Sequence, residues 1–136
     1  ILFNPKESID LQGNTGPFIQ YSYARIQSIF RKMATLGISL NEIQSNSLLP
    51  DEKALIVLIN QYPGVVQNAA DNYSPAEIAN YIYNLAKTFN SFYADHSILK
   101  ADNEEQQQLR AAIAKLTAHI LNSGLQLLGI QSPERM

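Results

Sequence analysis

Apolar residues recur every three or four positions through most of this 136-residue chain, and no stretch alternates apolar and polar residues as a half-buried strand would. This spacing lines apolar side chains along one face of a helix. Gly, Pro and capping residues interrupt the pattern and divide it into five expected helices. Their approximate ranges are 17–36, 51–62, 64–72, 75–95 and 103–128. The sequence therefore predicts an all-α fold, a single bundle of about five helices.

Two of these helices begin at strong local signals. Ser74 and Glu77 have the spacing of a capping box, in which each side chain accepts a hydrogen bond from the other residue's backbone N–H, and Asn103 and Gln106 repeat that spacing. Gly129 follows the last helix, where glycine commonly ends one. We therefore expect capped starts for the fourth and fifth helices.

Three helices carry apolar stripes that we expect to form the core. The expected core residues are Ile19, Tyr23, Ile26, Phe30 and Met33 in the first, Ile78, Ile82, Leu85, Phe89 and Phe92 in the fourth, and Leu109, Ile113, Leu116, Ile120 and Leu127 in the fifth. Gly124 leaves room for a close neighbour of the fifth helix. The second helix is apolar on nearly all sides at 54–59, so we expect it to be deeply buried.

The residue types needed for catalysis or metal binding are sparse. There is no Cys, and the two histidines, His96 and His119, have no second ligand at metal spacing. The carboxylates scatter near helix starts, where they offset the helix dipole. Residues 13–16 lack the spacing and the Lys of a phosphate-binding loop. We expect no catalytic residue, no metal and no cofactor site within this chain.

Composition places broad limits on the chain. No apolar run reaches the about 20 residues that span a bilayer, so we expect no membrane association. The absence of Cys fits a cytoplasmic location. Residues 1–13 have no helical period and begin with Ile rather than Met, so we expect a lead-in from an upstream domain, followed by a helical domain at 14–136. We expect this fragment to be monomeric.

The first helix carries a second face, roughly opposite its core stripe, that mixes aromatic rings, cations and a hydroxyl. Its members are Phe18, Tyr21, Arg25, Ser28 and Lys32. Aromatic rings stack unpaired bases and cations hold phosphates, so this face could bind single-stranded RNA. These residues alone favour a simpler alternative, in which the rings pack on a neighbouring helix and the cations are solvated. The formal net charge of −2 means that any RNA affinity needs a local basic surface or another domain.

Three segments together resemble one protein family. Residues 14–25, Asn-Thr-Gly-Pro-Phe-Ile-Gln-Tyr-Ser-Tyr-Ala-Arg, resemble the signature that opens the anticodon-binding domain of arginyl-tRNA synthetases. Residues 124–136 resemble the end of that family's chains, and residues 81–93 resemble a family helix ending in Asn-Ser-Phe-Tyr. The resemblance implies a helical bundle that binds the anticodon loop of arginine tRNA.

The resemblance also implies a larger enzyme that joins arginine to its tRNA using ATP. The two nucleotide-site signatures of class I synthetases, His-x-Gly-His and Lys-Met-Ser-Lys, are absent from this chain. We therefore expect ATP to bind the full-length protein only, through a catalytic domain that this chain contacts. Two alternatives are the homologous anticodon domain of another class I synthetase and a helical protein-interaction module without an RNA role.

Family positions imply specific tRNA contacts. Tyr21 and Tyr93 match tyrosines that meet the anticodon loop, and Met136 matches a terminal residue near the same bases. Phe18 stands where the family usually has Tyr, so it keeps a stacking ring but loses a hydroxyl. The remaining expected anticodon contacts, all within matched motifs, are Asn14, Gln20, Arg25 and Arg135.

Two of these residues have structural alternatives. Asn14 could equally cap the first helix, and Gln20 could instead fix the bundle. The tail after Gly129 contains Pro133, which stiffens the chain. Since the family places both ends of the domain beside the anticodon, we expect the tail to fold back and bring Met136 near the start of the first helix.

Overall fold

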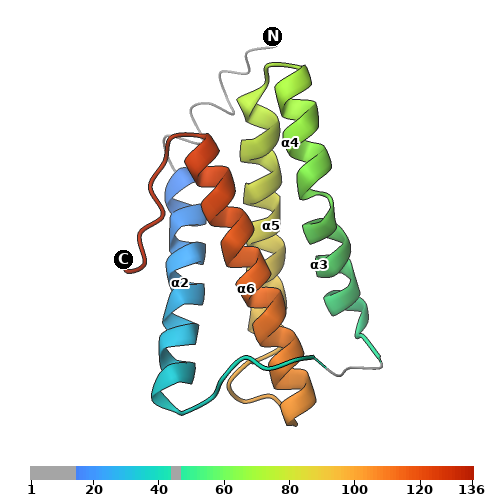
Figure 1. Ribbon diagram of the computed structural model, residues 1–136, viewed down its shortest axis with the longest axis vertical. Helices are drawn as coiled ribbons and strands as arrows, with labels where there is room; N and C mark the ends of the chain where they lie inside the picture. Colours follow the sequence, from blue (N-terminus) through green and yellow to red (C-terminus); the bar gives the residue numbers. More distant parts are fainter. Residues whose placement is uncertain (1–14, 44–46) are drawn as a thin grey trace.

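A computed structural model describes residues 15–43 and 47–136, and within these segments every regular element is a helix. The helices are α2 (Gly16–Thr35), α3 (Pro50–Asn60), α4 (Tyr62–Asp71), α5 (Pro75–Asp95) and α6 (Glu104–Leu127). The predicted all-α bundle is confirmed. Helices α3 and α4 stand end to end and form one side of the bundle, while α2 lies on the opposite side (Figure 1). The expected lead-in at 1–13 lies outside the described residues.

The two predicted capping boxes differ in outcome. Asn103 has extended backbone geometry (φ −149°, ψ 168°), and its Oδ1 accepts from the Gln106 N–H at 2.8 Å, although Gln106 Oε1 has no partner in return within the described segments. The Ser74 box is wrong. At Ser74 ψ is only 89°, no side-chain cap bond forms, and the Glu77 N–H donates to the Ser74 carbonyl instead. Side-chain capping requires the more extended backbone that Asn103 has.

Helix α3 begins with a cap that the sequence analysis missed. The Leu49 N–H donates to Glu52 Oε1 at 2.8 Å. The Glu52 side chain is buried, and its other oxygen lies 3.6 Å from Arg110 Nε on α6. Arg110 also donates from Nη1 to the Ser97 carbonyl at 2.8 Å. Glu52 therefore does more than offset a helix dipole, because it joins the start of α3 to α6.

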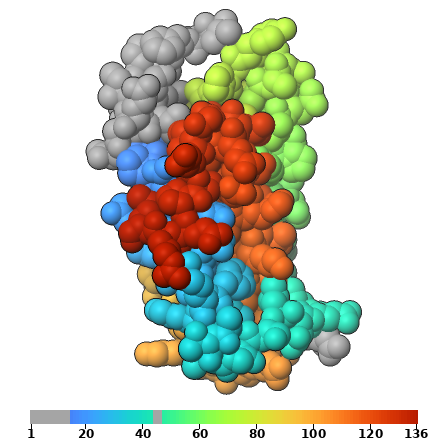
Figure 2. Space-filling view, turned by 60° about the vertical axis from the view of Figure 1, so that its left-hand side comes forward, coloured from blue at the N-terminus to red at the C-terminus, as the bar shows by residue number. Residues whose placement is uncertain are grey.

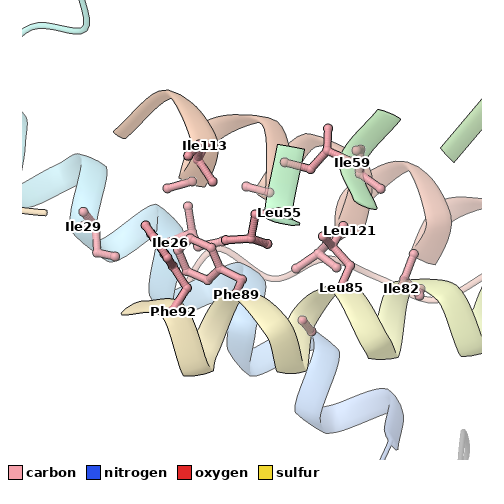
Figure 3. Close-up of a cluster of buried hydrophobic side chains, with 14 of the residues drawn as sticks. Ile26, Ile29, Leu55, Ile59, Ile82, Leu85, Phe89, Phe92, Ile113 and Leu121 are labelled. Carbon is pink, nitrogen blue, oxygen red and sulfur yellow. The ribbon is translucent and has the colours of Figure 1, made fainter. Parts of the chain in front are cut away.

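The predicted α5 stripe is confirmed, since all five of its residues are buried. Ile82, Leu85, Phe89 and Phe92 are labelled among the buried side chains in Figure 3. The α6 stripe is partly wrong: Leu116 and Leu127 are exposed, whereas Leu121 and Leu125 are fully buried. Helix α6 contacts α2, α3 and α5, so its buried arc is wider than one stripe and centred elsewhere. A Cβ added at Gly124 would lie 2.5 Å from Ile82 Cγ2, which confirms a close neighbour there.

Helices α2 and α3 also depart from the expected burial. On α2, Ile19, Ile26 and Met33 are buried as predicted, but Tyr23 and Phe30 are only half-buried. The deep burial expected for α3 is wrong, because Val57 is 51% exposed. Helix α3 forms an outer wall that presents one face to α5 and α6, so apolar residues on its other face stay in solvent.

Candidate nucleic-acid interface

A hollow of about 610 Å³ opens on the side of α2 that faces away from the core. We call it the α2 hollow. Its walls come from α2, from α5 and from the C-terminal tail, and the tail lies directly over α2 in the space-filling view (Figure 2). The lining residues are Phe18, Tyr21, Ser22, Ala24, Arg25, Ser28, Arg31, Asn90, Arg135 and Met136.

Helix α2 supplies the floor of the hollow. Tyr21, Ala24 and Ser28 follow one another at three- and four-residue spacing, which places them on one face. Ala24 lies on this outer face, yet it is only 6% exposed. Tyr21 is 59% exposed, so its ring is accessible to a stacking partner.

The tail forms one wall because two α2 side chains hold it. Gln20 Nε2 donates to the Gln131 carbonyl at 2.9 Å, and Arg31 Nη1 donates to the Glu134 carbonyl at 3.1 Å. The two donors are eleven residues apart, about three helical turns, so both face the same side of α2. Both acceptors are backbone atoms, so these two bonds depend on the path of the tail rather than on its side chains.

The expected fold-back of the tail is confirmed in outline. Met136 and Arg135 line the α2 hollow together with Tyr21. The detail is different, because the end of the chain lies beside the middle of α2 rather than near its start (Figure 1). Burial, followed by the carboxylate of Glu134 in the tail, raises the pKa of Tyr23 above its ordinary value.

Helix α5 contributes to the opposite wall. Arg25 Nη1 donates to Asn90 Oδ1 at 2.9 Å, and Asn90 Nδ2 donates to Ser22 Oγ at 2.8 Å. Phe18 packs edge-on against Tyr83, with ring centroids 5.5 Å apart. Phe18 thus performs the packing role that the residues alone favoured, while it still borders the hollow.

The lining of the α2 hollow is basic. It contains three arginines, Arg25, Arg31 and Arg135, and no Asp or Glu. The formal net charge of the chain is −2, so the charge of this surface has the opposite sign to that of the whole chain. Lys32, which the sequence analysis grouped with this face, is exposed but does not line the hollow. The net charge predicts that any RNA affinity needs a local basic surface or another domain, and the hollow is such a surface.

Tyr93 and Asn14 were expected to contact the anticodon, whereas Arg31 and Asn90 of the α2 hollow were not. Tyr93 does not line the hollow: it is half-buried, and its ring stacks on Phe89 at 6.1 Å. It follows Asn90 by three residues on α5, so it lies one turn further along the same side. Asn14 is outside the described residues. The sequence analysis missed Arg31 and Asn90; the spacing of Arg31 from Gln20 was a usable signal, but nothing local marked Asn90.

Charged clusters elsewhere do not form a second site of this kind. The two ion pairs in residues 15–43 and 47–136 are His96–Asp51, at 3.2 Å, and the buried Glu52–Arg110 pair. These segments contain no group of three His, Cys, Asp or Glu side chains that could hold a metal ion. Among the described helices, none is both long and apolar enough to cross a membrane.

Comparisons with known proteins agree with this geometry. Residues 19–136 match the family model of the DALR anticodon binding domain. An arginine–tRNA ligase of Bacteroides fragilis is 48% identical over 98% of this chain, and one of Flavobacterium psychrophilum is 52% identical over 100%. The chain spans 23% and 22% of their lengths.

Solved structures show the same similarity. Arginyl-tRNA synthetase of Thermus thermophilus superposes with a TM-score of 0.83 at 30% identity, and that of Plasmodium falciparum with 0.72 at 28%. Each match covers 98% of this chain and 23% of the solved one. The helical fold, the resemblance of both ends of the chain and the match over residues 19–136 lead to one conclusion: the chain belongs to the family of DALR anticodon-binding domains.

Proposed function

We propose that this chain binds the anticodon loop of arginine tRNA as the anticodon-binding domain of an arginine–tRNA ligase. The observation that carries the proposal is the α2 hollow, where two aromatic rings and three arginines surround one opening in a chain of net charge −2. An anticodon loop presents unpaired bases and closely spaced phosphates, which match those two kinds of side chain.

Each wall of the hollow has a role in this proposal. The exposed Tyr21 ring stacks a base, and Arg25 and Arg135 hold the adjoining phosphates. Met136 packs against a base without fixed geometry, because its side chain is flexible and polarizable. Tyr93 extends the contact surface one turn along α5. Gln20 and Arg31 contribute indirectly, because they hold the tail that carries Arg135 and Met136.

The genetic code determines which anticodon bases such a hollow must distinguish. Every arginine codon has G in the middle, so every arginine anticodon has C there, and the next anticodon base is G or U. Stacking on Tyr21 tolerates any base, so hydrogen bonds from backbone groups or amide side chains must select the C. The domain should therefore read the middle base strictly and accept two bases beside it.

The full-length protein implied by this proposal is a ligase that uses ATP. The chain spans under a quarter of each of the relatives described above, so activation of arginine would occur in the part outside it. We place that enzyme in the cytoplasm and expect this fragment to be monomeric and unable to activate arginine. Pyrophosphate exchange dependent on arginine, catalysed by residues 1–136 alone, would contradict the last point.

The proposal is tested by binding of an arginine-tRNA anticodon stem-loop. Tyr21→Ala should weaken binding by about 1–3 kcal/mol, the usual loss of one stacked base. Tyr73→Ala is the matched control, since this tyrosine is 74% exposed and does not line the hollow. Equal binding of a stem-loop whose middle C is replaced would refute specific recognition.

Two alternatives remain testable in the same assay. The homologous domain of a cysteinyl-tRNA synthetase would favour an anticodon with A after the middle C. We expect this chain to prefer G or U at that position. A protein-interaction module would bind no stem-loop at all.

A second hollow of about 320 Å³ lies between α2 and α6, and it includes Tyr23, Phe30 and Leu40 but a single cation, Lys115. The more basic α2 hollow favours RNA.

A further inference from the structure

Asn90 connects α5 to the rim of the α2 hollow through both ends of its side-chain amide. Its Oδ1 accepts from Arg25 Nη1 at 2.9 Å, and its Nδ2 donates to Ser22 Oγ at 2.8 Å. Ser22 Oγ in turn donates to the Phe18 carbonyl one turn earlier, at 2.9 Å. These bonds form a continuous chain from the backbone of α2, through α5, to the guanidinium of Arg25.

The chemistry of the four groups fixes the direction of this chain. A guanidinium can only donate, so the Asn90 amide must present its oxygen to Arg25. Ser22 uses its single hydrogen on the Phe18 carbonyl, so its oxygen must accept from Asn90. Ser22 is 3% exposed, which keeps water from competing for that bond. The amide of Asn90 therefore has one orientation that satisfies both neighbours.

The guanidinium of Arg25 keeps its positive charge in this arrangement. Arg25 is exposed at the edge of the hollow, and neither ion pair found within the described segments involves an arginine of the hollow. A neutral amide holds one N–H of the guanidinium and leaves the positive charge and the other donors available. A carboxylate at the same place would hold Arg25 more strongly but would cancel its charge.

We infer that Asn90 is a positioning residue, which orients Arg25 toward an RNA phosphate without neutralising it. The inference rests on the proposed function. Tyr21 and Arg25 are four residues apart on α2, so they are neighbours on its surface. A base stacked on Tyr21 brings its own phosphate within reach of Arg25, and a guanidinium already held by Asn90 loses less side-chain entropy when it binds.

The test compares Asn90→Asp with Asn90→Ala in the full-length protein, with binding of an arginine-tRNA anticodon stem-loop measured from 0.1 to 1 M salt. For single-stranded RNA each neutralised phosphate adds about 0.7 to the slope of log affinity against log salt. Asn90→Asp should reduce the slope by about this amount, so its affinity deficit should be roughly fivefold larger at 0.1 M than at 1 M salt. Asn90→Ala should bind more weakly with nearly the wild-type slope.

The thermal midpoint separates positioning from a merely structural role. Asp is nearly isosteric with Asn and accepts from Arg25 as a charged partner, but it has no donor for Ser22 Oγ, so Asn90→Asp should unfold near the wild-type temperature while it binds RNA less well. Asn84→Asp is the matched control, because Asn84 is an exposed residue of α5 outside the hollow. Asn84→Asp should change the salt slope by less than half of the change that Asn90→Asp causes.

A double-mutant cycle completes the test. In an Arg25→Ala background, Asn90→Ala should cause no further loss of RNA binding, because the group that it positions is gone. Additive losses, or an unchanged salt slope in Asn90→Asp, would overturn the inference. If the wild-type protein fails to prefer the arginine stem-loop, the proposed function fails first, and the two failures are therefore distinguishable.

Discussion

Helix α5 and the C-terminal tail are both held in place by side chains, but the contacts are of different kinds. Helix α5 buries a row of apolar residues, including Ile82, Leu85 and Phe89, each with no exposed surface. Beyond Ile130, which packs against the core, the side chains of Gln20 and Arg31 hold the tail on α2 by donating to two tail carbonyl groups, and these bonds are exposed to solvent. Burial of apolar surface stabilises the whole bundle, whereas exposed hydrogen bonds add little to it. We therefore expect that displacing the tail leaves the bundle folded, whereas unfolding the bundle also releases the tail.

The largest effect should come from emptying the core at α5. Phe89→Ala should lower the free energy of unfolding by about 3–5 kcal/mol, because it removes a fully buried ring. Leu116→Ala is the control: Leu116 is 50% exposed, and its loss should change the value by no more than about 0.5 kcal/mol. Urea unfolding followed by circular dichroism measures both. Similar losses in the two variants would break the distinction between core and surface.

A smaller loss is expected where Gly124 of α6 faces Ile82 of α5. Gly124→Ala should destabilise by about 1–3 kcal/mol, because the new Cβ would lie 2.5 Å from Ile82 Cγ2 in the packed core. Gly64→Ala on α4 has open space around it, so there the better helix propensity of Ala should stabilise by about 0.5–1 kcal/mol. Thermal unfolding of the two variants should therefore shift in opposite directions. An increase of the unfolding temperature in both variants would show that Ile82 can move aside.

Tyr81 adds a polar contact within the core, so its loss should cost less. Its hydroxyl donates to the Leu58 carbonyl at 2.6 Å, and Tyr81→Phe should lower the free energy of unfolding by about 1 kcal/mol. Burial, followed by the nearby Tyr62, raises the pKa of Tyr81 to about 12 from an ordinary 10.0. The unfolded chain thus loses this proton first, and stability should fall as pH rises from 10 to 12. Tyr81→Phe should show a shallower fall over that range, and an equal slope in both proteins would contradict the assignment.

The smallest effect on unfolding is expected at the tail. Gln20→Ala combined with Arg31→Ala should change the free energy of unfolding by no more than about 1 kcal/mol, since both bonds are exposed. The same variant should increase hydrogen exchange in residues 130–136 and weaken stem-loop binding. Gln67→Ala on α4 removes an exposed bond to Asp71 and serves as the control. Unchanged exchange in the tail would show that other contacts hold it.

Much of the fold could be predicted from local sequence patterns, and the predictions that were wrong share one cause. The α5 stripe was predicted in full because α5 packs on α2, α3, α4 and α6, so its apolar face has nowhere else to lie. The exposed Val57 on α3 and Leu116 on α6 were mispredicted because periodicity states that a face is apolar, not whether a neighbour covers it. The Ser74 cap failed for a similar reason, since residue types alone do not fix a backbone angle.

The sequence by itself determined where the helices run, which side of α5 is buried and which family the ends of the chain resemble. Only the tertiary structure decided how the α2 hollow is built. Gln20 meets Gln131 across 111 residues, and Arg25 meets Asn90 across 65. Helical periodicity reports neighbours three or four residues apart, because that is the length of one turn. Polar contacts between distant segments depend instead on how the packed helices and the tail bring single atoms within about 3 Å, and no local pattern records that distance.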